Sequence, residues 1–260
     1  MNQPKSAVIL GAQWGDEGKG KIVDVLSERF TVVARYAGGH NAGHTVIISG
    51  KKFVLHLIPC GVLRQGCKGV IGNGVVLDPA AFLAEVKMLK EQGLPVDGQL
   101  FVSNRAQVIL PYHRMIELAA ETAPGRTKIG TTRRGIGPSY EDKIHRNGLR
   151  VVDLMNPALL RTHITNACHE KNTIAHALFG TEPLDPKAMY EEGERQVSDE
   201  EFKEDVIIAA DPEVHVERIR EVEGLGATIV ALMNNSGADP LGAIETYKDK
   251  VLPRLGDGSG

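Results

Sequence analysis

Residues 11–21, GAQWGDEGKGK, combine the residue types that proteins use to hold phosphate groups. The segment follows an apolar run at 7–10 and precedes another at 22–26, which predicts a strand, a glycine-rich turn and the start of a helix. Glycines let backbone N–H groups approach an anion, and the amino end of a helix adds unpaired donors with partial positive charge. The segment is therefore predicted to bind phosphate; the plainer alternative is a βα turn with solvated charges.

The charged side chains of this segment could do more than bind an anion. Lys19 or Lys21 can supply a full positive charge, and Asp16 and Glu17 can meet a cation or move a proton. The spacing departs from a standard P-loop because Gly20, rather than Ser or Thr, follows Lys19. We therefore expect any Mg²⁺ to take its oxygen ligands from elsewhere.

Two further loops carry residues suited to the same chemistry. Residues 38–45, GGHNAGHT, follow a predicted strand at 31–36, and His44 within them is a candidate acid, although a lone loop histidine can equally be structural or exposed. Residues 122–150 read as one long loop rich in Gly, Thr, Arg and Lys. Arginines beside hydroxyls suit a phosphorylated ligand, while the alternative is a mobile, solvated loop.

The elements that would position these loops indicate an α/β protein. Asp78 and Pro79 predict the capped start of a helix that Gly93 ends. The other predicted elements are a hairpin at 46–48 and 53–55, a strand-like run at 69–77 with an Asn73-Gly74 turn inside it, and short strands at 100–102 and 108–110. Helices are predicted at 112–121 and 156–178, the second with a possible buried stripe of Leu159, Leu160, Ile164 and Ala167. We expect a P-loop-like, mostly parallel sheet flanked by helices, with the candidate site where strands end.

The carboxyl-terminal region has a different pattern. Strands at 206–208 and 228–233 alternate with helices that start near 211 and 240, which predicts a βαβα appendage. We place the domain boundary at 190, giving regions 1–190 and 191–260.

Composition narrows the class of protein. The formal net charge of −3 argues against a generally basic protein that coats nucleic acid. Three irregularly spaced cysteines without a CxxC pair suggest neither a disulfide framework nor a zinc site. No apolar run has transmembrane length and the first residues lack a secretory signal pattern, so we expect a cytoplasmic protein with no membrane partner.

Five motifs, in order, resemble those of adenylosuccinate synthetases, the GTP-dependent ligases of purine biosynthesis. They are GAQWGDEGKGKIVD, RYAGGHNAGHT, HLIPCGVLR, IGNGVVLDP and IGTTRRGIGPSYEDK, and the resemblance extends from about residue 7 to about residue 190. It implies an enzyme that joins IMP to L-aspartate using GTP and Mg²⁺, releasing GDP and phosphate, and that works as a homodimer.

The resemblance also implies roles for single residues. Asp16 would take the N1 proton of IMP, His44 would act as an acid toward the transferred phosphate, and Lys19 would contact the GTP phosphates. Mg²⁺ would be held by the carboxylate of Asp16 and the carbonyl of Gly43. Other GTP contacts would come from Gly15, Glu17, Gly18, Gly20, Lys21 and Thr45, and IMP contacts from Asn41, Ala42, Thr132 and, in the neighbouring subunit, Arg146.

The resemblance does not extend over the whole family pattern. Members of the family continue with a second half that supplies the guanine pocket and the aspartate loop, and no such motif follows residue 190. Residues 205–255 instead resemble the closing βα units of a luciferase-like, deazaflavin-dependent oxidoreductase, a fragment too short for a barrel and without expected redox activity. The alternative to a working ligase is therefore a non-catalytic nucleotide-binding fragment or fusion.

Overall fold

The computed structural model describes residues 6–10, 19–48, 50–94, 96–125, 127–197 and 249. The chain divides into two compact units, Met1–Ile207 and Ile208–Gly260, and almost all described residues belong to the first. Residues 11–18 of the glycine-rich turn and the elements predicted beyond 205 lie outside the described residues.

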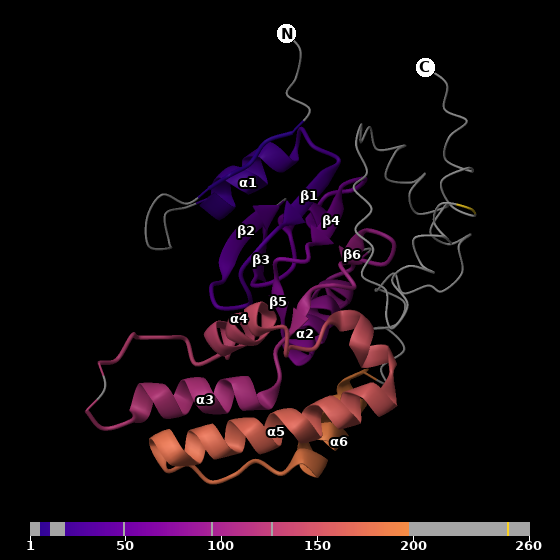
Figure 1. Ribbon diagram of the computed structural model, residues 1–260. Helices are drawn as coiled ribbons and strands as arrows, with labels where there is room; N and C mark the ends of the chain where they lie inside the picture. The colour runs from indigo at the N-terminus through magenta and orange to yellow at the C-terminus, as the bar shows by residue number, and fades with distance from the viewer. Residues whose placement is uncertain are drawn as a thin grey trace. The chain divides into compact units, whose positions relative to one another are not determined.

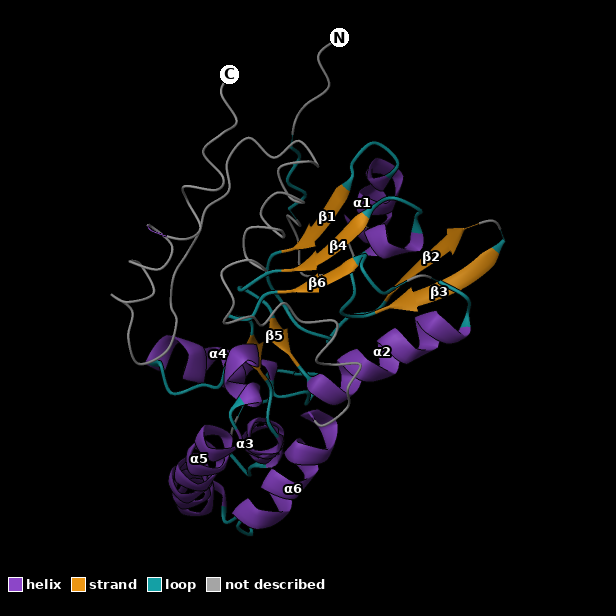
Figure 2. Ribbon diagram, turned by 90° about the vertical axis from the view of Figure 1, so that its right-hand side faces the viewer, coloured by secondary structure: helices purple, strands orange, loops and turns teal. Residues whose placement is uncertain are grey.

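A parallel sheet lies at the centre of the first unit, as Figure 2 shows. Its strands are β1 (Val32–Arg35), β4 (Lys68–Ile71) and β6 (Leu100–Val102), in the order β1-β4-β6. A second parallel pair joins β5 (Val76–Leu77) to β7 (Gln107–Val108). The predicted strand-like run at 69–77 with an Asn73-Gly74 turn inside it is confirmed, and the two sides of the turn belong to different sheets, as β4 and β5.

An antiparallel hairpin follows β1. Its strands are β2 (His44–Ile48) and β3 (Lys51–Leu55), and His44 pairs with Leu55 in the register. The predicted hairpin is confirmed, but it starts earlier than expected. His44 and Thr45 are therefore the first residues of a strand and not part of the preceding loop.

Six α-helices and two short 3₁₀ turns complete the described part of the chain (Figure 1). Helix α5 packs against both α3 and α6. Of the described helices, none has the length and apolar character that crossing a membrane requires. The helices are α1 (Lys19–Ser27), α2 (Pro79–Glu91), α3 (Pro111–Thr122), α4 (Ile136–His145), α5 (Pro157–Phe179) and α6 (Pro186–Val197), and the 3₁₀ turns are Cys60–Leu63 and Val151–Met155.

Helix α2 forms where the sequence predicted it, because its start carries two helix signals. The carboxylate of Asp78 accepts the backbone N–H of Ala81 at 3.1 Å, and Pro79 occupies the first helical position. Its inward side chains Phe82, Val86 and Leu89 are fully buried, so helical spacing of apolar residues identifies its core face.

Three further sequence predictions differ from the structure. Residues 7–10 form no strand: they carry no regular structure, Val8 and Leu10 are about 70% exposed, and the run pairs with none of the described strands. The predicted loop at 122–150 contains helix α4. In α5, Leu160 and Ile164 are buried as expected, whereas Leu159 is 44% exposed because it lies off the buried face.

Candidate functional site

Helix α1 and strand β2 bring two predicted phosphate-binding segments together. A Cβ built at Gly20, in the first turn of α1, would lie only 3.1 Å from the Cβ of His44. Arg64 holds α1 in place, because its guanidinium donates to the Ser27 hydroxyl at 2.7 Å and to the Asp24 carboxylate at 3.1 Å. His44 therefore lies beside the amino-terminal turn that carries Lys19, Gly20 and Lys21, while Gly15, Asp16, Glu17 and Gly18 fall outside the described residues.

Gly43, the residue before β2, lies against a second histidine. A Cβ at this position would come within 2.6 Å of Cε1 of His56, closer than atoms of folded proteins approach one another. Only glycine therefore lets the backbone at 43 lie against the imidazole.

A buried carboxylate fixes the segment that carries His56. Glu85 of α2 is only 7% exposed, and it accepts the backbone N–H groups of His56, Leu57 and Ile58 at 3.0, 2.9 and 3.2 Å. Burial raises the pKa of Glu85, and the three N–H donors oppose that rise. The carboxylate thus binds three successive amides and holds the position of His56.

Arg35, at the end of β1, links the same segment to the loop that follows it. Its guanidinium donates to the backbone carbonyls of His56 and Gly39. Burial lowers the pKa of Arg35, and Glu85 opposes this. The two loops that flank Gly43 are therefore joined by one arginine.

Two histidines of the site, His40 and His44, have pKa values below the ordinary value of histidine. Burial lowers the pKa of His40 to about 4, with further lowering by Arg134 and Arg114. Burial also lowers the pKa of His44, and Arg35 and His56 lower it further. An anion bound here would raise both pKa values, because it would offset the neighbouring positive charges.

The arginine-rich segment after α3 packs against the loop at 38–43. Arg134 donates to the carbonyl of His40, and Arg114 forms an ion pair with Asp78. Among the described residues of these two segments, Nδ1 of His40 and Oγ1 of Thr131 are buried without a hydrogen-bond partner, and so is Nδ1 of His56 in the segment after β3. Buried polar atoms are normally paired, so these atoms are suited to a polar ligand.

The remaining predicted contact residues are accessible to a ligand. Lys19, Lys21, Asn41, Ala42, Gly43, Thr45, Thr132 and Arg146 are all exposed. Thr132 precedes α4 and Arg146 follows it, so the two lie at opposite ends of a helix of ten residues, about 15 Å long. The structure therefore separates Arg146 from Thr132 instead of bringing them together.

The described residues suit Mg²⁺ only as a partner of the phosphates. They contain no group of three His, Cys, Asp or Glu side chains that could hold a metal ion. Mg²⁺ commonly keeps several waters and uses one or two protein oxygens together with substrate phosphates. The structure describes only Gly43 of the expected pair: it precedes His44, which lies beside the first turn of α1, whereas Asp16 lies outside the described residues.

Sequence reasoning missed His56, Glu85 and Arg35 as parts of this site. Glu85 carried a signal that could have been used, since it interrupts the apolar face formed by Phe82, Val86 and Leu89. A carboxylate on a buried helical face needs donors, and backbone amides of a loop are the commonest ones. His56 and Arg35 gave no comparable signal in the sequence.

Comparison with known proteins gives a consistent family. A sequence model of adenylosuccinate synthetase matches residues 8–219. The adenylosuccinate synthetase of Koribacter versatilis (strain Ellin345) is 74% identical over 192 residues, which are 74% of this chain and 43% of that protein. That of Solibacter usitatus (strain Ellin6076) is 57% identical over 189 residues, 73% of this chain and 44% of that protein.

A solved structure supports the same fold. The structure of fully ligated adenylosuccinate synthetase from Plasmodium falciparum superposes with a TM-score of 0.66 at 32% identity, covering 83% of this chain and 48% of that one. The α/β fold with a parallel sheet flanked by helices is therefore confirmed. This chain spans less than half the length of the curated relatives that it matches. With the family model covering most of its residues, and with His44 and Gly43 placed beside the start of α1, the chain belongs to the adenylosuccinate synthetase family.

Proposed function

We propose that this chain acts in the GTP-dependent ligation of IMP and L-aspartate, which yields adenylosuccinate, GDP and phosphate. The observation that carries the proposal is the packing of His44 against Gly20, within a family match over residues 8–219. This packing places a neutral histidine beside the amino end of a helix, which suits the transfer of a phosphate group.

In the proposed reaction, Asp16 acts as the base and His44 interacts with the transferred phosphate. Asp16 would remove the N1 proton of IMP, so that the 6-oxygen becomes nucleophilic toward the γ-phosphate of GTP. His44, neutral before the nucleotide binds, would donate a hydrogen bond to the transferred phosphate and stabilise its charge. Phosphorylation makes the 6-oxygen a good leaving group, which the amine of aspartate then displaces.

The GTP phosphates would be held by backbone amides and by lysine. Lys19 and Lys21 lie in or next to the first turn of α1, and Gly43 and Thr45 flank His44. Mg²⁺, held by Asp16 and the carbonyl of Gly43, would neutralise phosphate charge. Arg35, Arg114 and Arg134 add the positive surroundings that lower the histidine pKa values.

IMP would be bound by residues of two subunits. Asn41, Ala42 and Thr132 would contact it within one subunit. Arg146 lies a helix length away from Thr132, which supports the expectation that it reaches IMP bound in the neighbouring subunit of a homodimer.

The direct test is an assay of the purified chain with IMP, GTP, L-aspartate and Mg²⁺, followed by the ultraviolet absorbance change of the product and by phosphate release. We expect turnover that needs all four components and that Asp16→Ala abolishes without loss of the fold by circular dichroism. Turnover unchanged in Asp16→Ala would contradict the assigned base.

A second function follows from the motifs that the sequence carries. The motifs matched to the family belong to the phosphate and IMP segments, and none is assigned to a guanine or aspartate site, so the alternative proposal is a non-catalytic fragment or fusion that binds nucleotide without turnover. Isothermal titration calorimetry with IMP and with GTP distinguishes the two: binding without any product identifies the non-catalytic fragment.

The proposal also covers residues 191–260 and the cellular location of the protein. We assign residues 191–260 to a separate βαβα region whose 205–255 segment resembles a luciferase-like barrel fragment, and the family match to residue 219 overlaps its first part. We expect no oxidoreductase activity from it, because complete barrels need roughly 250 residues. Cytoplasmic location and the absence of nucleic-acid and membrane partners belong to the same proposal.

A further inference from the structure

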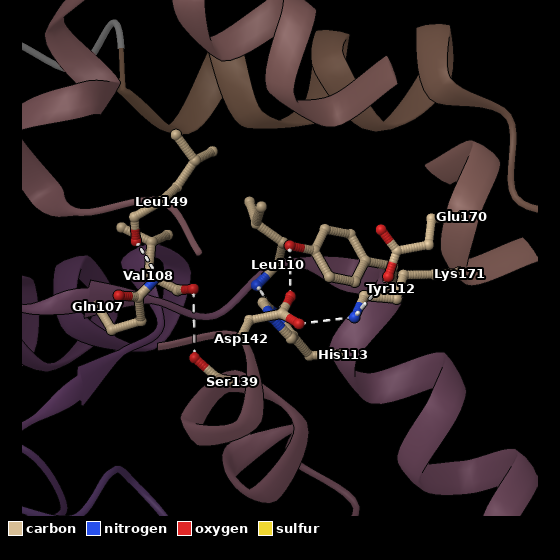
Figure 3. Close-up of polar contacts among 10 residues, drawn as sticks. All are labelled: Gln107, Val108, Leu110, Tyr112, His113, Ser139, Asp142, Leu149, Glu170 and Lys171. Atoms are coloured by element: carbon tan, nitrogen blue, oxygen red, sulfur yellow. Dashed lines mark hydrogen bonds and ion pairs between the residues drawn. The ribbon is translucent and has the colours of Figure 1, made fainter. Parts of the chain in front are cut away.

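A buried polar network joins helices α3, α4 and α5 around the side chain of Asp142 (Figure 3). The carboxylate is only 2% exposed. Its Oδ2 atom accepts from the hydroxyl of Tyr112 at 3.1 Å and lies 3.1 Å from Nε2 of His113, and its Oδ1 atom accepts from Nζ of Lys171 at 2.6 Å. No step of the proposed reaction uses these four side chains.

The protonation states in this network follow from its contacts. The backbone N–H of Leu110 donates to Nδ1 of His113 at 2.8 Å, so Nε2 carries the proton and donates to Asp142. Burial lowers the pKa of His113, which keeps the ring neutral. Burial alone would raise the pKa of Asp142, but donation by His113 and Lys171 holds it at about 2. The ammonium of Lys171 pairs with the buried carboxylate of Asp142 at 2.6 Å and, more distantly, with the half-exposed carboxylate of Glu170 at 3.6 Å, and two neutral donors complete the contacts of Asp142.

The backbone of Asp142 determines the turn that follows α4. Its carbonyl accepts the N–H groups of Asn147 at 2.9 Å and of Gly148 at 3.2 Å. Arg146 lies within this turn with φ of 64°, a left-handed conformation that non-glycine residues rarely adopt. Asp142 thus makes both contacts: its side chain is held in the core, and its backbone carbonyl closes the turn that carries Arg146.

The far side of the same turn is anchored independently. Gln107 is 4% exposed, and its Nε2 atom donates to the carbonyl of Leu149 at 2.7 Å. A Cβ at Gly148 would lie 1.8 Å from that Nε2 atom, so the turn packs directly on Gln107. Arg146 is exposed between these two anchors.

We propose that Asp142, with Tyr112, His113 and Lys171, is a positioning residue that fixes the backbone from which Arg146 meets an oxyanion. A guanidinium recognises phosphate or carboxylate through a fork of N–H donors, and a fixed backbone lowers the entropy lost when that fork is ordered. The proposal rests on the proposed function only in taking IMP as the ligand of Arg146. A network that merely ties three helices together would stabilise the fold without acting on Arg146.

The first test needs no nucleotide. Tyr112→Phe removes one donor to Asp142 and keeps the ring, and amide hydrogen exchange is measured over 146–149 in the ligand-free chain. We expect exchange to accelerate about fivefold, the effect of one lost hydrogen bond, and more in Asp142→Asn. Tyr140→Phe is the matched control, because the Tyr140 hydroxyl contacts Gly38 and Gly74 instead, and it should leave this segment unchanged.

The second test measures IMP binding by calorimetry in Tyr112→Phe, Arg146→Ala and the double variant. We expect Tyr112→Phe to weaken binding several-fold alone and to have no further effect once Arg146 is removed. Additive effects, or unchanged exchange at 146–149 in folded Tyr112→Phe and Asp142→Asn, would overturn the proposal. If Tyr112→Phe does not fold, Lys171→Met replaces it. Failure of the starting chain to bind IMP would count against the proposed function, while hydrogen exchange still decides whether Asp142 fixes the turn.

Discussion

Single atoms at Gly43 and His56 decide how closely two loops of the candidate site approach each other. The imidazole of His56 occupies the space that a side chain at 43 would need, with only 2.6 Å from its Cε1 to a Cβ. The His56 backbone cannot move away easily, because Glu85 and Arg35 hold its N–H and its carbonyl.

Gly43→Ala should therefore destabilise the fold by about 1–3 kcal/mol, the usual effect of overpacking, and should lower nucleotide binding as well. Urea unfolding measures the first effect and calorimetry with GTP the second. Adding His56→Ala removes the obstructing ring, so the double variant should regain part of the lost stability. A double variant less stable than Gly43→Ala by the full effect of His56→Ala would show that the contact is unimportant.

The depressed pKa of His40 predicts how stability depends on pH. Its pKa is about 4 in the folded chain against an ordinary 6.5, so below pH 6.5 the unfolded chain binds a proton that the folded chain does not. Stability should therefore fall as pH decreases from about 6.5 to about 4, with His40 contributing up to about 3 kcal/mol of the loss.

Urea unfolding at pH 7, 6 and 5 checks this dependence. His40→Gln should make the fall in stability shallower. His169→Gln, a substitution of an exposed histidine on α5, should leave the pH dependence of the free energy of unfolding unchanged. Equal slopes for His40→Gln and the starting chain would contradict the assignment.

At the scale of elements, Glu85 connects helix α2 to the segment at 56–58. Glu85→Gln places an amide N–H₂ group among three N–H donors and leaves at least one buried donor unpaired. We expect a loss of about 2–3 kcal/mol in the free energy of unfolding. Glu91→Gln, an exposed change near the end of the same helix, should change it by less than about 0.5 kcal/mol.

The sequence predicted those elements that are buried through apolar side chains and missed one that is buried through polar contacts. Helix α2 was predicted because Asp78 and Pro79 mark its start and apolar residues at helical spacing mark its core face. Helix α4 was missed because its buried residues are Ser139 and Asp142, which hydrogen-bond instead of forming an apolar stripe, and because it starts among glycine and proline. Hydrophobic periodicity cannot report a helix that is buried through polar contacts.

Only part of the candidate site could be predicted, because local residue patterns report binding segments but not contacts between distant segments. The pattern of glycines, lysines and histidines predicted phosphate-binding segments at 11–21 and 38–45, and the described parts of both lie side by side. The interrupted apolar face of α2 marks Glu85 as a residue that needs donors, but which distant loop supplies them, and which carbonyls Arg35 meets, depends on the tertiary fold and is not encoded in a local pattern. The apolar run at 7–10 predicted a strand, but a strand also needs a neighbour to pair with.

At the scale of the whole molecule, several large apolar side chains of the described residues are exposed. Val8, Leu10, Ile22 and Val25 are each more than half exposed, and two of them belong to α1. Neighbouring exposed apolar side chains favour self-association.

Val25→Lys should therefore reduce concentration-dependent association without lowering thermal stability, because Val25 is 64% exposed already. Sedimentation velocity over a range of protein concentrations measures the association. Leu178→Lys, at a 66% exposed position on α5, serves as the control and should leave association unchanged. A starting chain that stays at one sedimentation coefficient at all concentrations would contradict this expectation.

The order of strands in the central sheet has a consequence for synthesis on the ribosome. Strand β1 pairs only with β4 among the described strands, and Val32 meets its partner Lys68 roughly three dozen residues later. At about 5–20 residues per second, the nascent β1 waits some seconds for that partner, whereas the hairpin of β2 and β3 can close as soon as it emerges. Strand β1 therefore stays unpaired with β4 during that interval of translation.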